Sequence, residues 1–273
     1  MRPKAVVSAN LAKPLHWFLS TLFLLAFALV WLALWIPLQL PGKAGWPDAV
    51  LVLVAAASTL VSLSRQLPAQ NVVLAAAVIA FIAAVVEGVG TATSVPFGPF
   101  TCTDEAGLRI LNQLAWPIPL IWVIAILNSR GVARLILRPW HKLRAYGFWL
   151  IGLTALLTVL FDFNLEPFAT RVKHYWLWHP TKFPITWHGA PLVNFFAWLV
   201  TALLILAFVA PALINKQQRP ARRPPDYYPL VVWLLVNVLF ATGAFAHQLW
   251  AAAGVSVASI ILAAIFAIRG ARW

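Results

Sequence analysis

Residues 70–89 read QNVVLAAAVIAFIAAVVEGV, and this stretch decides the fold. No charged side chain occurs in it before Glu87. A helix needs about 20 mostly apolar residues to cross the hydrocarbon core of a bilayer. The stretch therefore predicts a membrane-spanning helix that carries one carboxyl group near its end.

Similar apolar runs recur along the whole chain and predict an all-α, polytopic membrane bundle of about eight helices. Residues 1–273 then form a single membrane domain. The composition agrees with this, because 62% of the residues are hydrophobic and 10% are charged, whereas soluble domains carry about 25% charged residues. The other predicted spans are 16–37, 48–64, 110–128, 145–161, 192–214, 228–246 and 248–268.

The net charge of +13 would suit a nucleic-acid binder. The lysines and arginines cluster between apolar runs, however, as helix flanks that face anionic lipid do. We therefore expect lipids, and no nucleic acid, as partners. With the N-terminus inside, 15 of the 20 basic residues fall on the inner side, which predicts that both termini face the cytoplasm. The outer basic residues are Lys43, Arg109, Arg171, Lys173 and Lys182.

The same topology places six of the seven acidic residues at or beyond the outer ends of helices. Two outer loops, roughly 90–109 and 162–191, are the longest in this topology. Side chains from these loops can converge on one site. The six acids are Asp48, Glu87, Asp104, Glu105, Asp162 and Glu166.

The first segment with chemical potential runs from Glu87 to Asp104 and reads EGVGTATSVPFGPFTCTD. An ionised carboxylate at membrane depth is costly, and a neutral carboxylic acid in an apolar pocket can act as a proton donor. Alternatively, Glu87 lies at the interface and faces water. The glycines and prolines that follow predict an irregular, non-helical segment.

The second segment is Asp162–Pro167, DFNLEP. Its two carboxyl groups are four residues apart, so a helical backbone places both on one face. Two carboxyl groups in different surroundings can divide acid and base roles; the alternative is a helix end with solvated acids. Pro167 predicts that the helix ends here. The aromatic cluster Tyr175–Trp178 that follows is typical of an interfacial belt.

The third segment is Trp187–Trp198, WHGAPLVNFFAW. Pro191 suits the first turn of a helix, which places Asn194 near the outer end of that helix. Asn194 either forms a hydrogen bond between helices or orients a catalytic carboxylate.

Metal binding is not expected from the ligands that this chain offers. His174, His179 and His188 share one outer loop, but their spacing differs from that of paired ligands at i and i+4 on a helix. The single cysteine, Cys102, also excludes an intrachain disulfide and a site built from several thiolates.

The three segments resemble the carotenoid biosynthesis membrane-protein family that includes the carotenoid 1′,2′-hydratases and the archaeal bisanhydrobacterioruberin hydratase. The resemblance covers a core of about residues 85–198. This chain departs from the family pattern where it has Glu166 instead of an aspartate, where it lacks aromatic hydroxyls near Phe100 and Cys102, and where glycine is expected near Ser94. The matching residues are Glu87–Thr91, Pro96–Gly98, Ile118–Trp122, Asp162, Leu165–Pro167, Gly189–Phe195 and Trp198.

The resemblance implies addition of water to the terminal C1′,2′ double bond of an acyclic carotenoid, either lycopene-like or a bacterioruberin precursor. It implies no cofactor, a substrate dissolved in the bilayer, and a multi-pass location in a bacterial or archaeal cytoplasmic membrane. Other carotenoid enzymes are candidate partners. The candidate catalytic residues are Glu87, Asp162, Glu166 and Asp104. The candidate substrate-binding residues are Asn194, Trp116, Trp122, Phe97, Tyr175 and Trp198.

Two other functions fit parts of the pattern. A carotenoid end-group cyclase or isomerase would begin with the same protonation, and the mass of its product would lack the added water. A membrane transporter or lipid-binding protein would also use intramembrane carboxyl groups, but the acids gather at one side and no repeated halves are evident.

Overall fold

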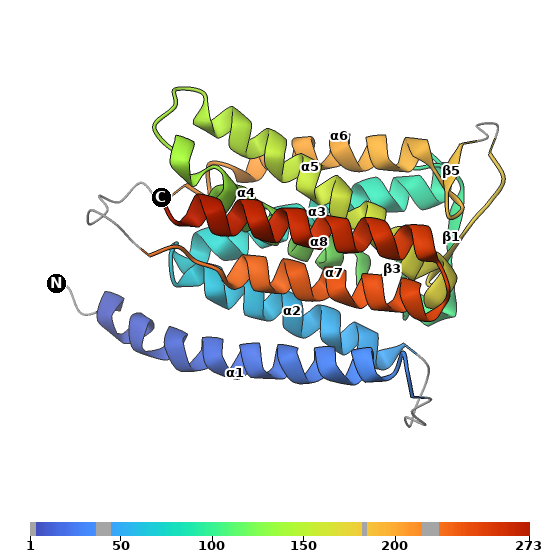
Figure 1. The fold of residues 1–273 in the computed structure, drawn as a ribbon, viewed down its shortest axis with the longest axis horizontal. Helices are drawn as coiled ribbons and strands as arrows, with labels where there is room; N and C mark the ends of the chain where they lie inside the picture. Colours follow the sequence, from blue (N-terminus) through green and yellow to red (C-terminus); the bar gives the residue numbers. More distant parts are fainter. Residues whose placement is uncertain (1–3, 37–44, 182–184, 215–223) are drawn as a thin grey trace.

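The computed structural model describes residues 4–36, 45–181, 185–214 and 224–273, with side chains described from residue 13 onward. Among these residues, eight helices are long and apolar enough to cross a membrane, which confirms the predicted all-α bundle (Figure 1). They are α1 (Lys4–Leu32), α2 (Trp46–Ser64), α3 (Ala69–Thr93), α4 (Ile118–Ile136), α5 (Tyr146–Pro167), α6 (Leu192–Val209), α7 (Tyr228–Ala246) and α8 (Trp250–Ala271).

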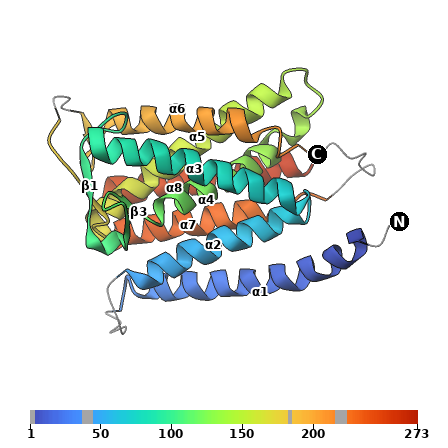
Figure 2. The same cartoon turned by 180° about the vertical axis from the view of Figure 1, so that it is seen from behind.

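Short strands collect at one end of the bundle, which we call the strand end (Figures 1 and 2). The opposite end, where α1 begins and α8 ends, is the termini end. Three antiparallel pairs form, namely β1 with β4, β2 with β3, and β5 with β6. The strands are β1 (Phe100–Cys102), β2 (Arg109–Ile110), β3 (Leu114–Ala115), β4 (Trp176–Trp178), β5 (Thr186–Trp187) and β6 (Ala190–Pro191).

The pairing of β1 with β4 joins the two long loops that the sequence predicts to converge. Phe100 lies opposite Trp178, and Cys102 lies opposite Trp176. Because side chains alternate across a strand, Trp176 and Trp178 point to the same side, while Leu177 is exposed on the other. This small sheet lies at the strand end of the bundle (Figure 1).

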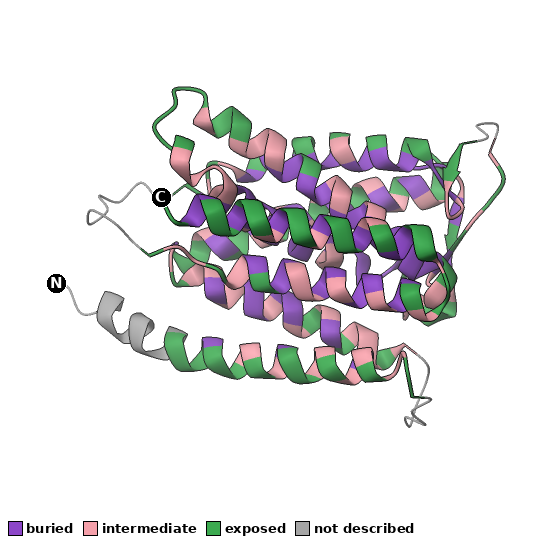
Figure 3. Ribbon diagram, viewed as in Figure 1, coloured by how far each residue is buried: buried purple, intermediate pink, exposed green. Residues whose placement is uncertain are grey.

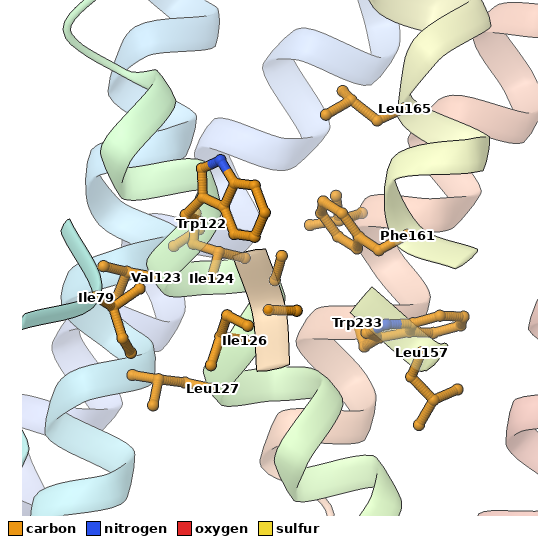
Figure 4. Packing of buried hydrophobic residues seen from close by; sticks show 14 of the residues in the cluster. Ile79, Trp122, Val123, Ile124, Ile126, Leu127, Leu157, Phe161, Leu165 and Trp233 are labelled. Carbon is orange, nitrogen blue, oxygen red and sulfur yellow. The ribbon is translucent and has the colours of Figure 1, made fainter. Parts of the chain in front are cut away.

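Helix α4 is the central helix of the bundle. Of its most apolar stretch, 78% is buried, against 17% for α1, which lies at the periphery (Figure 3). Trp122 and Ile126 of α4 pack toward Phe161 of α5 and Trp233 of α7 in the core (Figure 4). The exposed apolar side chains of α1, α3 and α8 suit contact with lipid chains.

Helix α3 is longer than predicted, because the segment after Glu87 stays helical to Thr93. The expectation of irregular backbone directly after Glu87 was wrong. Gly90 serves close packing: a Cβ there would lie 2.6 Å from a ring carbon of Phe97. The helix ends at Thr93, and Ser94 caps it in a left-handed conformation with φ of 66°, shortly before Pro96.

The α-helix of the fifth span ends at Pro167, as predicted, but the chain stays helical beyond it. The chain continues through Pro167 into a π-helical turn, Phe168–Val172. Proline lacks the N–H that would donate to the carbonyl four residues earlier, and that carbonyl belongs to Phe163. Trp187 replaces the missing donor, since its Nε1 lies 2.9 Å from the Phe163 oxygen. The helix therefore passes the proline without an unpaired carbonyl.

Two other predicted boundaries change for similar local reasons. The fourth span was predicted from residue 110, but residues 109–115 form the β2–β3 hairpin, and α4 begins at Ile118 after Pro117. Helix α6 ends at Val209, two residues before Pro211. The predicted division between the last two spans near His247 is confirmed.

Candidate active site

Three carboxyl groups meet at the strand end of the bundle. Glu87 comes from α3, and Asp162 and Glu166 come from successive turns of α5. Their exposed fractions are 5%, 0% and 2%, so all three are buried. They line a cavity of about 30 Å³, here called the carboxyl pocket. A water molecule needs at least about 10–15 Å³ measured in this way, so the pocket has room for one or two.

Glu87 is held by a tryptophan of the central helix. The Trp122 Nε1 donates to Glu87 Oε1 over 2.8 Å. Trp122 in turn stacks on Trp198 of α6, with ring centroids 3.8 Å apart and planes 13° from parallel. An indole fixed by stacking has little freedom to rotate, so its N–H stays directed at the carboxyl group.

Asn194 connects the two carboxyl groups of α5. Its Nδ2 donates to Asp162 Oδ2 at 2.8 Å and to Glu166 Oε1 at 3.3 Å. Pro191 at the start of α6 places Asn194 in the first turn, as predicted. The other oxygen, Asp162 Oδ1, is fully buried and has no hydrogen-bond partner among the described residues. Buried oxygens without a hydrogen-bond partner are uncommon in folded proteins. Asp162 Oδ1 is one of them, and its residue lines the pocket.

Glu166 receives two further hydrogen bonds from strand β4. Trp178 Nε1 and Trp176 Nε1 donate to its Oε2 at 2.9 and 3.2 Å. The aromatic cluster that is typical of an interfacial belt therefore supplies polar contacts to a buried acid. The signal for this in the sequence is the alternation Trp-Leu-Trp, which in a strand puts both indoles on one face.

The walls of the pocket are aromatic and aliphatic, and no lysine, arginine or histidine is among the described residues that line it. A proton is then the counter-charge available to the carboxyl groups. Besides the three acids and Asn194, the lining residues are Phe100, Ile118, Ile121, Trp122, Leu165, Trp176, Trp178 and Trp198. Such a pocket can transfer a proton to an apolar substrate and hold a positively charged intermediate between indole faces.

Four residues predicted from the sequence lie outside the pocket lining. Asp104 has a side chain that is 97% exposed and pairs with Arg109 at 2.6 Å, because the loop that carries it turns toward the surface. Trp116 lies beside Gly107 in the same loop.

The third of these residues, Phe97, is 1% exposed. It packs behind Phe100, with ring centroids 6.5 Å apart, and Phe100 is the residue that reaches the pocket. Phe100 was not among the substrate-binding residues predicted from the sequence.

The fourth residue, Tyr175, faces the start of α2 and not the pocket. Burial, followed by the charge of Asp48 and a hydrogen bond to it, raises the pKa of the Tyr175 phenol well above its usual range. Lys173 pairs with Asp48 at 3.0 Å. Nearby in β1, burial raises the pKa of the Cys102 thiol. Both groups stay neutral at ordinary pH and belong to the packing around the pocket.

The sequence matches the profile of carotenoid biosynthesis proteins over residues 47–263. That range contains all of α2 but its first residue, α3 to α7, most of α8, and every residue of the carboxyl pocket. No curated protein and no solved structure matches the chain. The match covers well over half of the sequence, and this multi-pass chain therefore belongs to the carotenoid biosynthesis protein family.

Proposed function

We propose that the protein is a carotenoid 1′,2′-hydratase, which adds water to the terminal double bond of an acyclic carotenoid. The observation that carries the proposal is the meeting of three buried carboxyl groups around a water-sized cavity with indole walls. Family membership supports a substrate from carotenoid metabolism. Addition of water causes no net oxidation or reduction of the substrate, so the reaction needs no redox cofactor.

The reaction proceeds in two balanced steps. A carboxylic acid gives its proton to C2′, whose electrons come from the C1′=C2′ π bond, and a tertiary carbocation is left at C1′. A water molecule then bonds to C1′ through its oxygen, and its extra proton goes to a carboxylate of the pocket. The product is a tertiary alcohol. The three acids together then carry the same number of protons as before the reaction.

We assign the proton donation to Asp162. Its Oδ1 is buried at the pocket without a partner, so that oxygen is available to the alkene. Glu166 accepts hydrogen bonds on both oxygens and is held in place, and Glu87 is fixed by the hydrogen bond from Trp122. Glu166 and Glu87 can therefore orient the water molecule and accept its extra proton.

The volume of the pocket favours hydration over cyclisation. Space for one or two water molecules lies directly against the carboxyl groups. A cyclase would need to keep water away from the same cation. The indoles of Trp122, Trp176, Trp178 and Trp198 can each stabilise the cation by about 0.5–2 kcal/mol while the water approaches.

Expression in a lycopene-producing host followed by mass analysis of the pigments tests this function. The unchanged protein should yield pigments heavier by one or two waters. Asp162→Asn and Glu87→Gln should insert normally and yield only lycopene. Asp104→Asn is the matched control, because this exposed acid lies outside the pocket, and it should retain full activity. Pigments of unchanged mass with a ring at the end would favour a cyclase, and full hydration by both pocket variants would refute the assignment.

A further inference from the structure

A second cavity, of about 780 Å³, opens at the termini end of the bundle, far from the carboxyl pocket. It lies among the ends of α2 and α4, the start of α5 and the segment that leads into α7, with Trp273 at its rim. The two cavities share no lining residue. Its volume is within the range of about 300–1,000 Å³ that ligand sites occupy. We call it the basic cavity.

Its charge is strongly positive. Five cationic side chains line it, namely Arg65, Arg130, Arg134, Arg138 and Lys142, against one acid among the described residues, Asp226. That acid is engaged by neutral donors: Gln66 donates to Oδ2, and the Tyr228 backbone N–H lies 3.1 Å from Oδ1. Guanidinium groups are well suited to phosphate, because their planar donors can bind two oxygens at once.

The cationic lining extends into the protein. Arg130 is only 8% exposed, and its Nη2 donates to the Leu213 carbonyl at 2.8 Å. Leu213 follows the end of α6 at Val209, so the Arg130 guanidinium lies at the level of the helix ends and is enclosed by protein there. The positive charge of the cavity therefore includes a buried guanidinium as well as exposed flanking residues.

Polar atoms deeper in the basic cavity lack partners. Ser62 and Asn128 line it and are 2% and 1% exposed. Ser62 Oγ and Asn128 Oδ1 have no hydrogen-bond partner among the described residues, although Asn128 Nδ2 donates to Thr59 Oγ1 at 3.1 Å. Buried polar atoms are normally paired, so these two are candidate partners for a polar group that enters the deep end of the cavity.

We propose that the basic cavity binds a phosphate group. Arg134 and Arg138 hold its charged oxygens, and the Ser62 hydroxyl donates to a deeper oxygen. The apolar part of the lining, including Leu63 and Leu127, leaves space for the hydrocarbon of a phosphate ester. Two sources share this chemistry: the headgroup of an anionic phospholipid, and free phosphate from the solution. The proposal does not depend on the reaction at the carboxyl pocket.

Thermal unfolding of the purified full-length protein in detergent separates the two sources. Phosphatidylglycerol is compared with phosphatidylcholine, and sodium phosphate with sodium chloride at equal ionic strength. Ligands that bind the folded state raise its unfolding temperature in proportion to the logarithm of their concentration. A rise with phosphatidylglycerol alone identifies a lipid headgroup, and a rise with phosphate identifies a soluble ligand. Both results support a phosphate site.

The double variant Arg134→Gln/Arg138→Gln should weaken the binding at least about tenfold, because hydrogen bonds between charged groups exceed the ~1.4 kcal/mol that a tenfold change requires. The matched control is Arg269→Gln/Arg272→Gln. It removes the same charge at the same end, from exposed residues that do not line the cavity. Binding by the control should equal that of the unchanged protein.

If Arg134→Gln/Arg138→Gln fails to fold, Arg65→Gln/Lys142→Gln replaces it, since both residues are exposed at the rim. That variant should weaken binding severalfold through lost attraction. The proposal is overturned if neither phosphatidylglycerol nor phosphate stabilises the protein beyond its reference. It is also overturned if the cavity variants and the control respond equally. Pigment products should be unchanged in all variants, which keeps this test separate from that of the hydratase reaction.

Discussion

Asn194 of α6 donates a hydrogen bond to Asp162 of α5, with 2.8 Å between Nδ2 and Oδ2. The bond leaves the other carboxyl oxygen of Asp162 at the pocket without a partner. Under the proposed function, this amide selects the oxygen of the acid that is available for chemistry. The same nitrogen also reaches Glu166 Oε1 at 3.3 Å, so Asn194 contacts both carboxyl groups of α5.

Replacing Asn194 by leucine should lower kcat at least tenfold with little change in KM, because the acid is then no longer oriented although the apolar walls remain. Unpaired buried acceptors should also reduce the free energy of unfolding by about 1–3 kcal/mol. Steady-state kinetics on lycopene in detergent, with unfolding measured in parallel, check both. Asn194→Gln keeps the amide and should recover part of kcat. A change confined to stability would contradict the positioning role.

Trp176→Phe and Trp178→Phe should each reduce activity, and the double variant should reduce it more than either, since Oε2 of Glu166 then loses both donors. Phenylalanine preserves most of the aromatic wall, so the change falls mainly on the hydrogen bonds. Leu177→Ala is the control between them, because that side chain is exposed on the other face of β4. Equal activities for the control and the double variant would show that the indole N–H groups are not needed.

Trp187 supplies the donor that Pro167 lacks for the Phe163 carbonyl. The effects of mutating Trp187 and Pro167 on the free energy of unfolding should therefore be coupled. Trp187→Phe should destabilise the protein by about 1–3 kcal/mol, because the Phe163 carbonyl loses its donor. In the Pro167→Ala background the restored backbone N–H can bond to that carbonyl, so the same change should have a smaller effect. A double-mutant cycle on the free energy of unfolding measures the difference. Additive effects would contradict the proposed compensation.

Substrate access can be tested at the surface of the carboxyl pocket. Among the described residues that line it, Ile121 and Trp178 are partly exposed and the others are buried. The end of a carotenoid is larger than the pocket, so we expect it to enter beside these two side chains. Ile121→Trp should lower kcat/KM about tenfold or more without loss of folded protein. Leu204→Trp, on a lipid-exposed part of α6, is the control and should leave kcat/KM unchanged.

The sequence is sufficient to predict the eight helices and all four of the polar residues Glu87, Asp162, Glu166 and Asn194 that line the pocket. Apolar length alone determines the spans, and the four-residue spacing places Asp162 and Glu166 on one face. Glu87 stands out because it ends an uncharged run. The position of Asn194 near a helix end follows from Pro191 before it. The sequence could not decide whether Asn194 bonds a neighbouring helix or orients a carboxylate.

Other features depend on contacts between distant segments and could not be derived from the local sequence. Pro167 predicts the end of the α-helix. The chain continues as a π-helical turn because the indole of Trp187, 20 residues further along, supplies the donor that Pro167 lacks. Phe97 and Phe100 look equivalent in the sequence, and the β1–β4 pairing determines which of them reaches the pocket. Asp104 has the right chemistry, but its loop carries it to the surface. The orientation of the termini relative to the cytoplasm stays a prediction from the basic residues.

Conversion of lycopene by the purified protein in water enriched in oxygen-18 tests the hydratase assignment most directly. The product should gain one labelled water for each end that reacts. Asp162→Asn should give no labelled product, while Asp104→Asn should behave like the unchanged protein. Labelled product formed at the full rate by Asp162→Asn, or a product that contains no oxygen from water, would contradict the account.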